Sequence, residues 1–258
     1  MKQRETADVL ENVRIAEDIY SLRLHAPKIA KTSSAGQFVT LYCRDRSRLL
    51  PRPISVCEAD AEKGELRLVF RIAGAGTKEF SALKSGEALD LAGPLGNGFP
   101  EESASGKRAL LFGGGIGIPP MLQLAKDLKD RAQVRAVLGF RDEQYLTEDF
   151  ARHCAVSVAT EDGSAGTKGN VIDAVRAEGL GADVFYACGP LPMLRAVSAL
   201  AEETGAECWL SMEEKMACGI GACLSCVCKT REVDAHSQVR NRRVCTEGPV
   251  FRSTEIVL

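Results

Sequence analysis

The sequence lacks a strong charge of either sign, a long apolar run and an internal repeat. Its 258 residues carry 33 basic and 35 acidic side chains, which leaves a formal net charge of -2. Nucleic-acid-binding chains normally present a basic face, and this balance gives no sign of one. The longest uncharged run, 109–125, is broken by four glycines and two prolines and is shorter than the roughly 20 mostly apolar residues of a bilayer span. We therefore expect neither nucleic acid nor a membrane as a partner.

The first residues, MKQRETADVLEN, include no apolar core and no small-residue cleavage site. We therefore expect no secretory leader and a cytoplasmic chain. In such a reducing compartment the ten cysteines are not expected to form structural disulfides, which favours metal binding or redox chemistry.

Two kinds of pattern divide the chain. Residues 1–100 contain short alternating apolar runs between turn residues, which predict an antiparallel β-barrel or sandwich, with one short helix at 77–84. Residues 101–212 alternate strands with helices, which predicts a parallel sheet covered by helices. The expected strands are 109–112, 134–140, 155–159, 184–188 and 207–212, and the expected helices are 120–129, 170–178 and 191–204. Residues 213–258 hold five of the ten cysteines and little helical periodicity, so we expect a small cofactor-bearing extension there.

A glycine-rich loop follows the first strand of the second part. The stretch GGGIGIPP includes Gly115 and Gly117 and leads into a helix that starts with prolines. Glycines allow a close backbone approach to a pyrophosphate, and a helix N-terminus favours anions, so these two residues are candidate nucleotide ligands. Pro120 replaces the third glycine of the usual fingerprint, and the next strand ends in Arg141 rather than an acidic residue. NAD and NADP, or even a plain tight turn, therefore remain open.

The fourth strand of this part ends in Cys188, Gly189 and Pro190. Ligands of open parallel sheets bind beyond the carboxyl ends of strands, which places Cys188 to face a nicotinamide. A small buried cysteine without a functional role explains the same residue equally well.

The C-terminal extension includes a cysteine pattern with a recognisable spacing. Cys218, Cys223 and Cys226 form C-x4-C-x2-C, and Cys245 follows after eighteen residues. This spacing is typical of a plant-type [2Fe–2S] site, whereas structural zinc sites favour paired C-x2-C knuckles, and a redox dithiol normally opens a helix. Cys228 is nearer in sequence than Cys245, but in an extended segment it points away from Cys226. We expect Cys245 to be the fourth ligand.

Glycines interrupt this cysteine pattern at Gly219 and Gly221. Without a Cβ atom the loop can adopt positive φ and turn its amides toward the inorganic sulfides.

Several short motifs occur in the order found in the ferredoxin–NADP reductase superfamily, which residues 5–212 resemble. These motifs are Arg52-Pro53-x-Ser55, Gly74-x-Gly76-Thr77, AGPLGNGF at 92–99, Gly115-x-Gly117-x-x-Pro120 and Cys188-Gly189-Pro190. The resemblance implies FAD between a six-stranded barrel and a nucleotide domain, with Arg52 on the diphosphate, Ser55 near the isoalloxazine ring, and Gly76 and Thr77 on the phosphate side. An arginine fork and helix-opening amides suit a phosphate. The other flavin contacts that it implies are Pro53, Ile54, Val69, Phe70 and Arg71.

With EEKMACGIGACLSC and RVCTEGPVF added, nearly the whole chain resembles the iron–sulfur electron-transfer subunits of NAD-dependent dihydroorotate dehydrogenases. The resemblance implies FAD, one [2Fe–2S] cluster and NAD, and a heterotetramer with two FMN-containing subunits that oxidise dihydroorotate for pyrimidine biosynthesis. Electrons would pass from FMN through the cluster and FAD to NAD⁺, with no general acid or base in this chain. A subunit of another flavin and iron–sulfur complex, such as a ferredoxin reductase, sulfite reductase or hydrogenase module, remains an alternative. So does a non-enzymatic zinc-binding adaptor.

Overall fold

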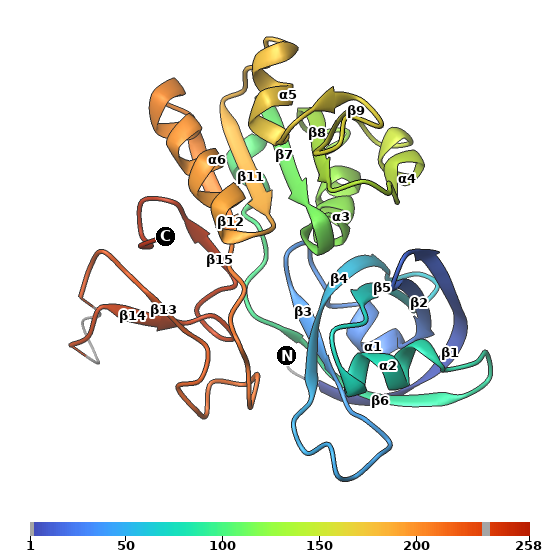
Figure 1. Ribbon diagram of the computed structural model, residues 1–258. Coiled ribbons are helices and arrows are strands. Elements are labelled where there is room, and N and C mark those ends of the chain that lie inside the picture. Colours follow the sequence, from blue (N-terminus) through green and yellow to red (C-terminus); the bar gives the residue numbers. More distant parts are fainter. Residues whose placement is uncertain (1–2, 234–237) are drawn as a thin grey trace.

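The computed structural model describes residues 3–233 and 238–258 (Figure 1). Its N-terminal part is a closed antiparallel barrel with the strand order β1-β2-β5-β4-β3-β6. Alternate side chains of these strands point inward, so that leucines such as Leu22, Leu24, Leu66 and Leu68 fill the interior. The strands are β1 (Gln3–Ala16), β2 (Ile19–His25), β3 (Phe38–Leu41), β4 (Arg52–Asp60), β5 (Glu65–Arg71) and β6 (Ala88–Leu95). The barrel predicted from the sequence is confirmed, and two short helices, α1 (Pro27–Ala30) and α2 (Ala75–Ser81), join its strands.

The second part is built on a seven-stranded sheet with the order β10-β9-β8-β7-β11-β12-β15. All its strands run parallel except the last, as the alternation of strands and helices predicts. The strands are β7 (Arg108–Gly114), β8 (Gln133–Phe140), β9 (Ala155–Thr160), β10 (Thr167–Lys168), β11 (Val184–Cys188), β12 (Glu207–Ser211) and β15 (Val250–Arg252). The helices are α3 (Pro119–Leu128), α4 (Thr147–Ala151), α5 (Val171–Ala177) and α6 (Leu191–Thr204), with 3-10 turns η1 (Glu101–Ala104) and η2 (Gly115–Gly117).

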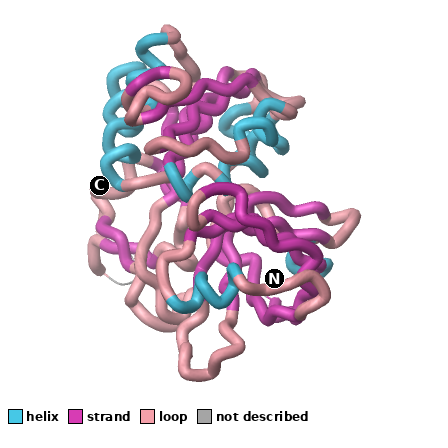
Figure 2. Tube along the Cα trace, turned by 45° about the vertical axis from the view of Figure 1, so that its right-hand side comes forward, coloured by secondary structure: helices cyan, strands magenta, loops and turns pink. Residues whose placement is uncertain are grey.

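The helices cover the two faces of this sheet separately. Buried residues of α5 and α6 pack in one apolar cluster, and those of α3 and α4 in another. Figure 2 shows the helices gathered in this half of the molecule, above a half made mainly of strands and loops. After β7 the chain moves to β8 on one side, and it returns to β11 on the other side. Sheets with such a reversal bind their ligands in the crevice outside the carboxyl ends of the strands that flank it, which here are β7 and β11.

The C-terminal extension lies beside the barrel and below the sheet (Figure 1). It contains a two-stranded ribbon of β13 (Val227–Lys229) and β14 (Asn241–Arg243). Its β15 pairs antiparallel with β12, and Cys245, Phe251 and Ile256 belong to the same apolar cluster as α6. The extension therefore shares a sheet and an apolar core with the part before it. The domain boundaries expected at residues 100 and 212 stay predictions.

Among the described residues, no helix has both the length and the apolar character needed to cross a membrane.

Candidate functional site

The glycine loop and the Cys188 turn lie against each other at the switch point of the sheet. Cys188 pairs with Gly113 across β11 and β7. A Cβ atom on Gly117 would overlap the carbonyl group of Cys188 and the nitrogen of Gly189. The glycine at 117 is therefore required by the approach of two backbone segments, a packing reason that the sequence did not reveal. Gly115, with φ +50°, has open space around it, and its nearest neighbour is Nη2 of Arg71, 3.9 Å from an ideal Cβ position.

Cys188 ends β11 at the rim of this crevice. Burial raises the pKa of its thiol to about 12, although a hydrogen bond with Ser211 works in the other direction. The side chain is therefore a neutral thiol near pH 7 and is suited to line a pocket rather than to attack a ligand. Gly189 is half-buried behind it, and Pro190 is exposed.

The flavin motif of the sequence lies on β4. Pairing with β3 places Arg52 opposite Leu41 and Ser55 opposite Phe38, so that Arg52 to Ser55 form the first part of β4 beside β3. The guanidinium of Arg52 passes directly over the first turn of α2, because a Cβ atom on Gly76 would overlap its Nε. The first amides of α2 have no partner within the helix, and the guanidinium of Arg52 lies beside them. The two sets of donors can therefore bind the same anion.

Thr77 holds the loop before α2 in shape. Its hydroxyl accepts hydrogen bonds from the amides of Ala73 (2.9 Å) and Gly74 (3.2 Å) and donates one to the carbonyl of Gly74 (3.1 Å). The side chain is thereby occupied, so only the backbone amide of Thr77 is available to a phosphate.

Three residues expected to contact the flavin lie at the end of β5, and their side chains have different surroundings. Phe70 is in the barrel core, stacked on Tyr20 at 6.1 Å and edge-on to Phe80 at 6.3 Å between ring centroids. Val69 is buried in the apolar cluster that includes α3. A bound flavin can therefore meet these two residues only through their backbone. Arg71 is exposed and faces the glycine loop.

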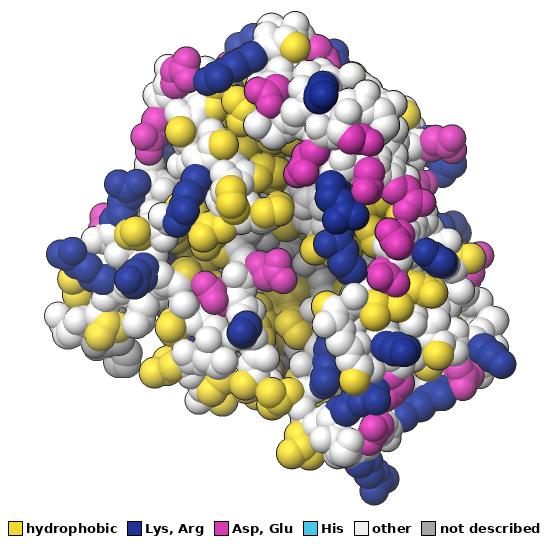
Figure 3. Space-filling view, viewed as in Figure 1, with side chains coloured by type: hydrophobic (Ala, Val, Ile, Leu, Met, Phe, Trp, Pro, Cys, Tyr) yellow, Lys and Arg dark blue, Asp and Glu magenta, His cyan; other side chains and the backbone are white. Residues whose placement is uncertain are grey.

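We call β4, which bears the motif Arg52 to Ser55, the flavin strand. A groove of about 490 Å³ opens between the start of this strand and the extension. Its walls are Leu50 to Pro53 on one side and Glu213 to Met216 on the other. Figure 3 shows a hollow at the centre of this face, between the sheet, the barrel and the extension. The volume is in the range of cofactor pockets, and Arg52 supplies a charged group at its wall.

Four cysteines of the extension form two adjacent pairs. The sulfurs of Cys218 and Cys223 are 3.3 Å apart, and the thiol of Cys226 is close enough to Cys245 to help raise the pKa of Cys245. Within the part of the chain that the structure describes, no three histidine, cysteine or carboxylate side chains form a site for one metal ion. A cluster with two irons, each held by two thiolates, suits two pairs better than a single ion does.

Backbone amides surround these thiols. Burial works against ionisation of Cys218, but hydrogen bonds from the amides of Ile220, Cys223 and Ala222 lower its pKa to about 6. Burial raises the pKa of Cys245 to about 11, and the amide of Gly221 opposes this. Gly219 and Gly221 have φ of +67° and +88°, as the sequence predicts for a loop that turns its amides toward sulfur.

Cys228 is placed apart from the four. It lies on β13 opposite Arg242, with its side chain buried in the core that the extension shares with the sheet. This position suits a cysteine outside the ligand set, although the assignment of ligands itself stays a prediction.

Two residues without a predicted role hold the extension on the barrel, one at the cysteine loop (residues 216–228) and one just after Cys245. An ideal Cβ on Gly219 would lie 2.9 Å from the methyl group of Thr40 on β3, which itself pairs with Pro53 of the flavin strand. Asn97 donates from its side chain to the carbonyl of Glu247 (3.0 Å) and from its backbone to that of Gly248 (2.7 Å). The motif AGPLGNGF contains Asn97, and it was the only signal for this role.

Comparison with known proteins gives matches along the whole chain. Residues 213–257 match the family model of the iron-sulfur cluster binding domain of dihydroorotate dehydrogenase B, and residues 6–99 match that of the oxidoreductase FAD-binding domain. The chain is 42% identical over 263 residues to the electron transfer subunit of dihydroorotate dehydrogenase B (NAD(+)) from Geobacillus sp. (strain WCH70), with 100% of both covered. The protein of that name from Bacillus caldolyticus is 44% identical over 261 residues, with 99% of each covered.

Solved structures are similar as well. A chain of an NADH-dependent reduced ferredoxin-NADP oxidoreductase superposes with a TM-score of 0.86 at 30% identity, covering 97% of this chain and 89% of that one. The ferredoxin reductase of carbazole 1,9a-dioxygenase gives 0.65 at 20% identity, over 80% of this chain and 67% of that one. The second likeness concerns the fold alone.

Serine substitutions test whether Cys245 rather than Cys228 is the fourth cluster ligand. We expect Cys245→Ser to lose the [2Fe–2S] cluster, because serine replaces a thiolate of the Cys226 pair, whereas Cys228→Ser should keep two irons per chain. Iron and acid-labile sulfide are measured in both purified variants. Full iron in Cys245→Ser, or its loss in Cys228→Ser, would overturn the assignment.

Gly117→Ala tests the packing of the glycine loop. The added methyl group meets the backbone of Cys188, so we expect the loop to shift and the Kd for NADH to rise at least roughly tenfold, since small misplacements at such sites have large effects. Bound FAD should stay constant. Gly181→Ala is the matched control, because only a side-chain atom of Arg108, 3.9 Å away, lies near its added methyl group. An unchanged Kd in Gly117→Ala would contradict this reading.

Proposed function

This chain belongs to the family of electron transfer subunits of NAD-dependent dihydroorotate dehydrogenase B, and from that premise we propose where each cofactor binds and how electrons cross the chain. FAD lies along Arg52 to Ser55, NAD lies at the carboxyl ends of β7 and β11, and the [2Fe–2S] cluster is held by Cys218, Cys223, Cys226 and Cys245. The chain exchanges electrons between the FMN of a catalytic partner and NAD⁺.

The contact between the cysteine loop and the barrel is the observation that carries this proposal. Gly219 packs on Thr40, and Thr40 is one strand away from Pro53 of the flavin strand. A groove of about 490 Å³ lies nearby, between Leu50 to Pro53 and the segment Glu213 to Met216 that leads into the cysteine loop. When bound, the cluster supplies single-electron exchange and FAD can exchange either single electrons or a hydride. We infer that electrons pass in the order cluster, FAD, NAD, because the cysteine loop contacts the strand beside the one that bears Arg52 to Ser55.

The residues of this chain bind and orient the cofactors. Arg52 and the first amides of α2, including those of Gly76 and Thr77, are placed to hold the FAD diphosphate. Ser55, three residues after Arg52 on β4, would lie near the isoalloxazine ring, and Ile54 would be a further flavin contact. Arg71 lies beside Gly115, where it can receive the phosphates of NAD.

Cys188 contributes a neutral thiol to the nicotinamide side of the crevice. Hydride transfer between nicotinamide and flavin needs no protein acid or base. Cys188 therefore helps to position the nicotinamide and does not transfer a proton.

The exposed apolar residues around the thiols favour a partner at this surface. Ile220 and Leu224 are 52% and 72% exposed in the cysteine loop, and Leu49 and Leu50 are 85% and 54% exposed in the loop before β4. Ile220 and Leu224 are four residues apart in one loop, and exposed apolar groups that occur together mark interaction sites more often than single exposed residues do. We place the FMN-containing subunit here, in a heterotetramer of two of each chain.

A second function has one observation in its favour. The similarity to a chain of an NADH-dependent reduced ferredoxin-NADP oxidoreductase extends over 97% of this chain at 30% identity, so a ferredoxin-linked complex is the main competitor. The identities of 42% and 44% to the dihydroorotate dehydrogenase B subunits favour the first function. The zinc-binding adaptor does not agree with membership of an oxidoreductase family.

An anaerobic titration with NADH tests the function. We expect flavin bleaching together with the EPR signal of a reduced [2Fe–2S] cluster, and we expect dihydroorotate to replace NADH as the reductant only when the catalytic subunit is present. If NADH leaves either cofactor oxidised, the proposed route is wrong. Reduction by ferredoxin, with none by dihydroorotate and the catalytic subunit, would favour the competitor.

Charged substitutions test the partner surface. We expect Leu224→Glu and Ile220→Glu to weaken association with the FMN-containing subunit by at least roughly tenfold, because a charge buried without a partner opposes docking. Their iron content and NADH-dependent flavin bleaching should be unchanged. Leu10→Glu on β1, where Leu10 is 39% exposed, is the control. Equal affinity of all variants would place the partner elsewhere.

A further inference from the structure

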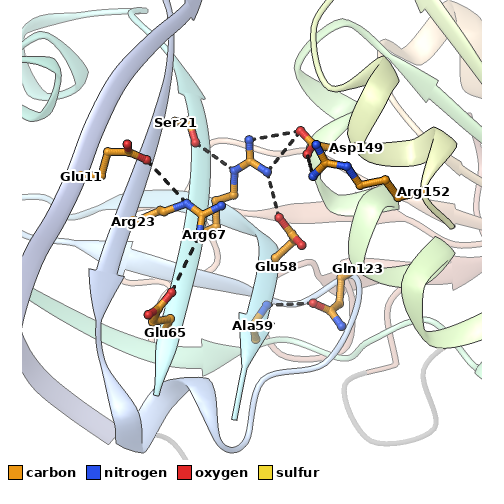
Figure 4. A network of polar contacts seen from close by, with 10 residues as sticks. All are labelled: Glu11, Ser21, Arg23, Glu58, Ala59, Glu65, Arg67, Gln123, Asp149 and Arg152. Atoms are coloured by element: carbon orange, nitrogen blue, oxygen red, sulfur yellow. Dashed lines mark hydrogen bonds and ion pairs between the residues drawn. The ribbon is translucent and has the colours of Figure 1, made fainter. Parts of the chain in front are cut away.

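An ion cluster joins the barrel to the nucleotide part, away from the thiols (Figure 4). Its centre is Arg67 on β5, whose side chain is only 12% exposed. The guanidinium donates to Ser21 Oγ (2.9 Å) and to Glu58 Oε2 (2.9 Å), both in the barrel. Its two terminal nitrogens also donate to Oδ2 of Asp149 on α4 at 3.3 and 3.4 Å. One buried cation therefore links two barrel strands to a helix of the other half.

The helix that carries Asp149 is attached to the glycine loop. Tyr145 lies just before α4, and its hydroxyl donates to the carbonyl of Gly115 at 2.5 Å. The ring of Tyr145 is 7% exposed and packs edge-on against Phe140 at 5.5 Å. The amide of Phe150 bonds to Leu146, so Tyr145 and Asp149 belong to one short, well-fixed segment.

We propose that the Arg67–Asp149 ion pair is a positioning device that acts through Tyr145 to fix Gly115, and with it the nicotinamide crevice, relative to the flavin strand. We call Arg67, Asp149, Tyr145 and Gly115 the clasp. The inference rests on the proposed placement of NAD at the ends of β7 and β11. On this proposal the clasp sets the distance between nicotinamide and flavin, and the rate of hydride transfer depends steeply on that distance.

Other contacts hold the two halves together without the clasp. The amide of Ala59 on β4 donates to Gln123 Oε1 on α3 (2.8 Å), and the amide of Glu17 donates to Glu143 Oε2 (2.7 Å). Removing the charge of Asp149 should therefore leave the halves joined and the barrel intact. The expected result is a loosened segment 145–151 and a glycine loop that is less well placed.

The obvious variants are Asp149→Asn and Tyr145→Phe, singly and together. Each single change should slow flavin bleaching by NADH in single turnover by roughly tenfold, as expected for a misplaced reactant. The double variant should be no slower than the slower single, because both changes break the same connection. The control is Arg152→Gln, since Arg152 is 69% exposed and also pairs with Asp149 (3.2 Å) but is outside the clasp. Its rate should stay within about twofold of the parent.

Amide hydrogen exchange provides a readout that needs no nucleotide. In Asp149→Asn, exchange at residues 113–117 should be faster than in the parent, with FAD and iron contents unchanged. Unchanged rate and exchange in Asp149→Asn, or rate effects of the two substitutions that multiply, would overturn the inference. A parent protein whose flavin is not bleached by NADH would instead refute the proposed function, and the exchange result would still decide whether the clasp fixes the loop.

Discussion

The packing of the cysteine loop against the barrel is the constraint on which the rest of the structure depends. Single-electron carriers must be close to each other, and here the loop lies against β3, next to the strand that bears Arg52. Two features hold it there. Asn97 bonds to the segment just after Cys245, and β15 continues that segment into the sheet beside β12. The extension is thus fixed to both halves, so the proposed cluster ligands have a defined position relative to β4 and to the ends of β7 and β11.

Much of this arrangement could be predicted from local signals. Alternation of period two gave the barrel, and the alternation of strands with helices gave the parallel sheet, because both patterns reflect which side of each element is buried. The spacing of Cys218, Cys223 and Cys226 indicated the cluster, since thiolates in one loop must surround a compact group. The structure brings Cys245 to Cys226, although a gap of eighteen residues by itself fixes no contact.

The remaining features depend on contacts between residues far apart in the chain. Arg67 and Asp149 are separated by 82 positions and Asn97 and Glu247 by 150, and no local pattern records such pairs. A Gly-rich turn predicts that Gly117 meets a ligand, and its close approach to the backbone at Cys188 is a second reason for a glycine that the turn does not reveal. Phe70 is another residue whose surroundings only the folded chain reveals. Its motif position suggests a flavin contact, but its ring fills the barrel beside Tyr20, and only the folded strand shows which way it points.

The central claim is that electrons pass between NADH and the cluster only through FAD. The most direct measurement is rapid freeze-quench EPR of the intact and the deflavinated chain after mixing with NADH. The account predicts that flavin bleaching precedes the reduced [2Fe–2S] signal in the intact chain. It also predicts that NADH gives no such signal in the deflavinated chain, although dithionite reduces its cluster. Reduction of the cluster by NADH without flavin would contradict the account.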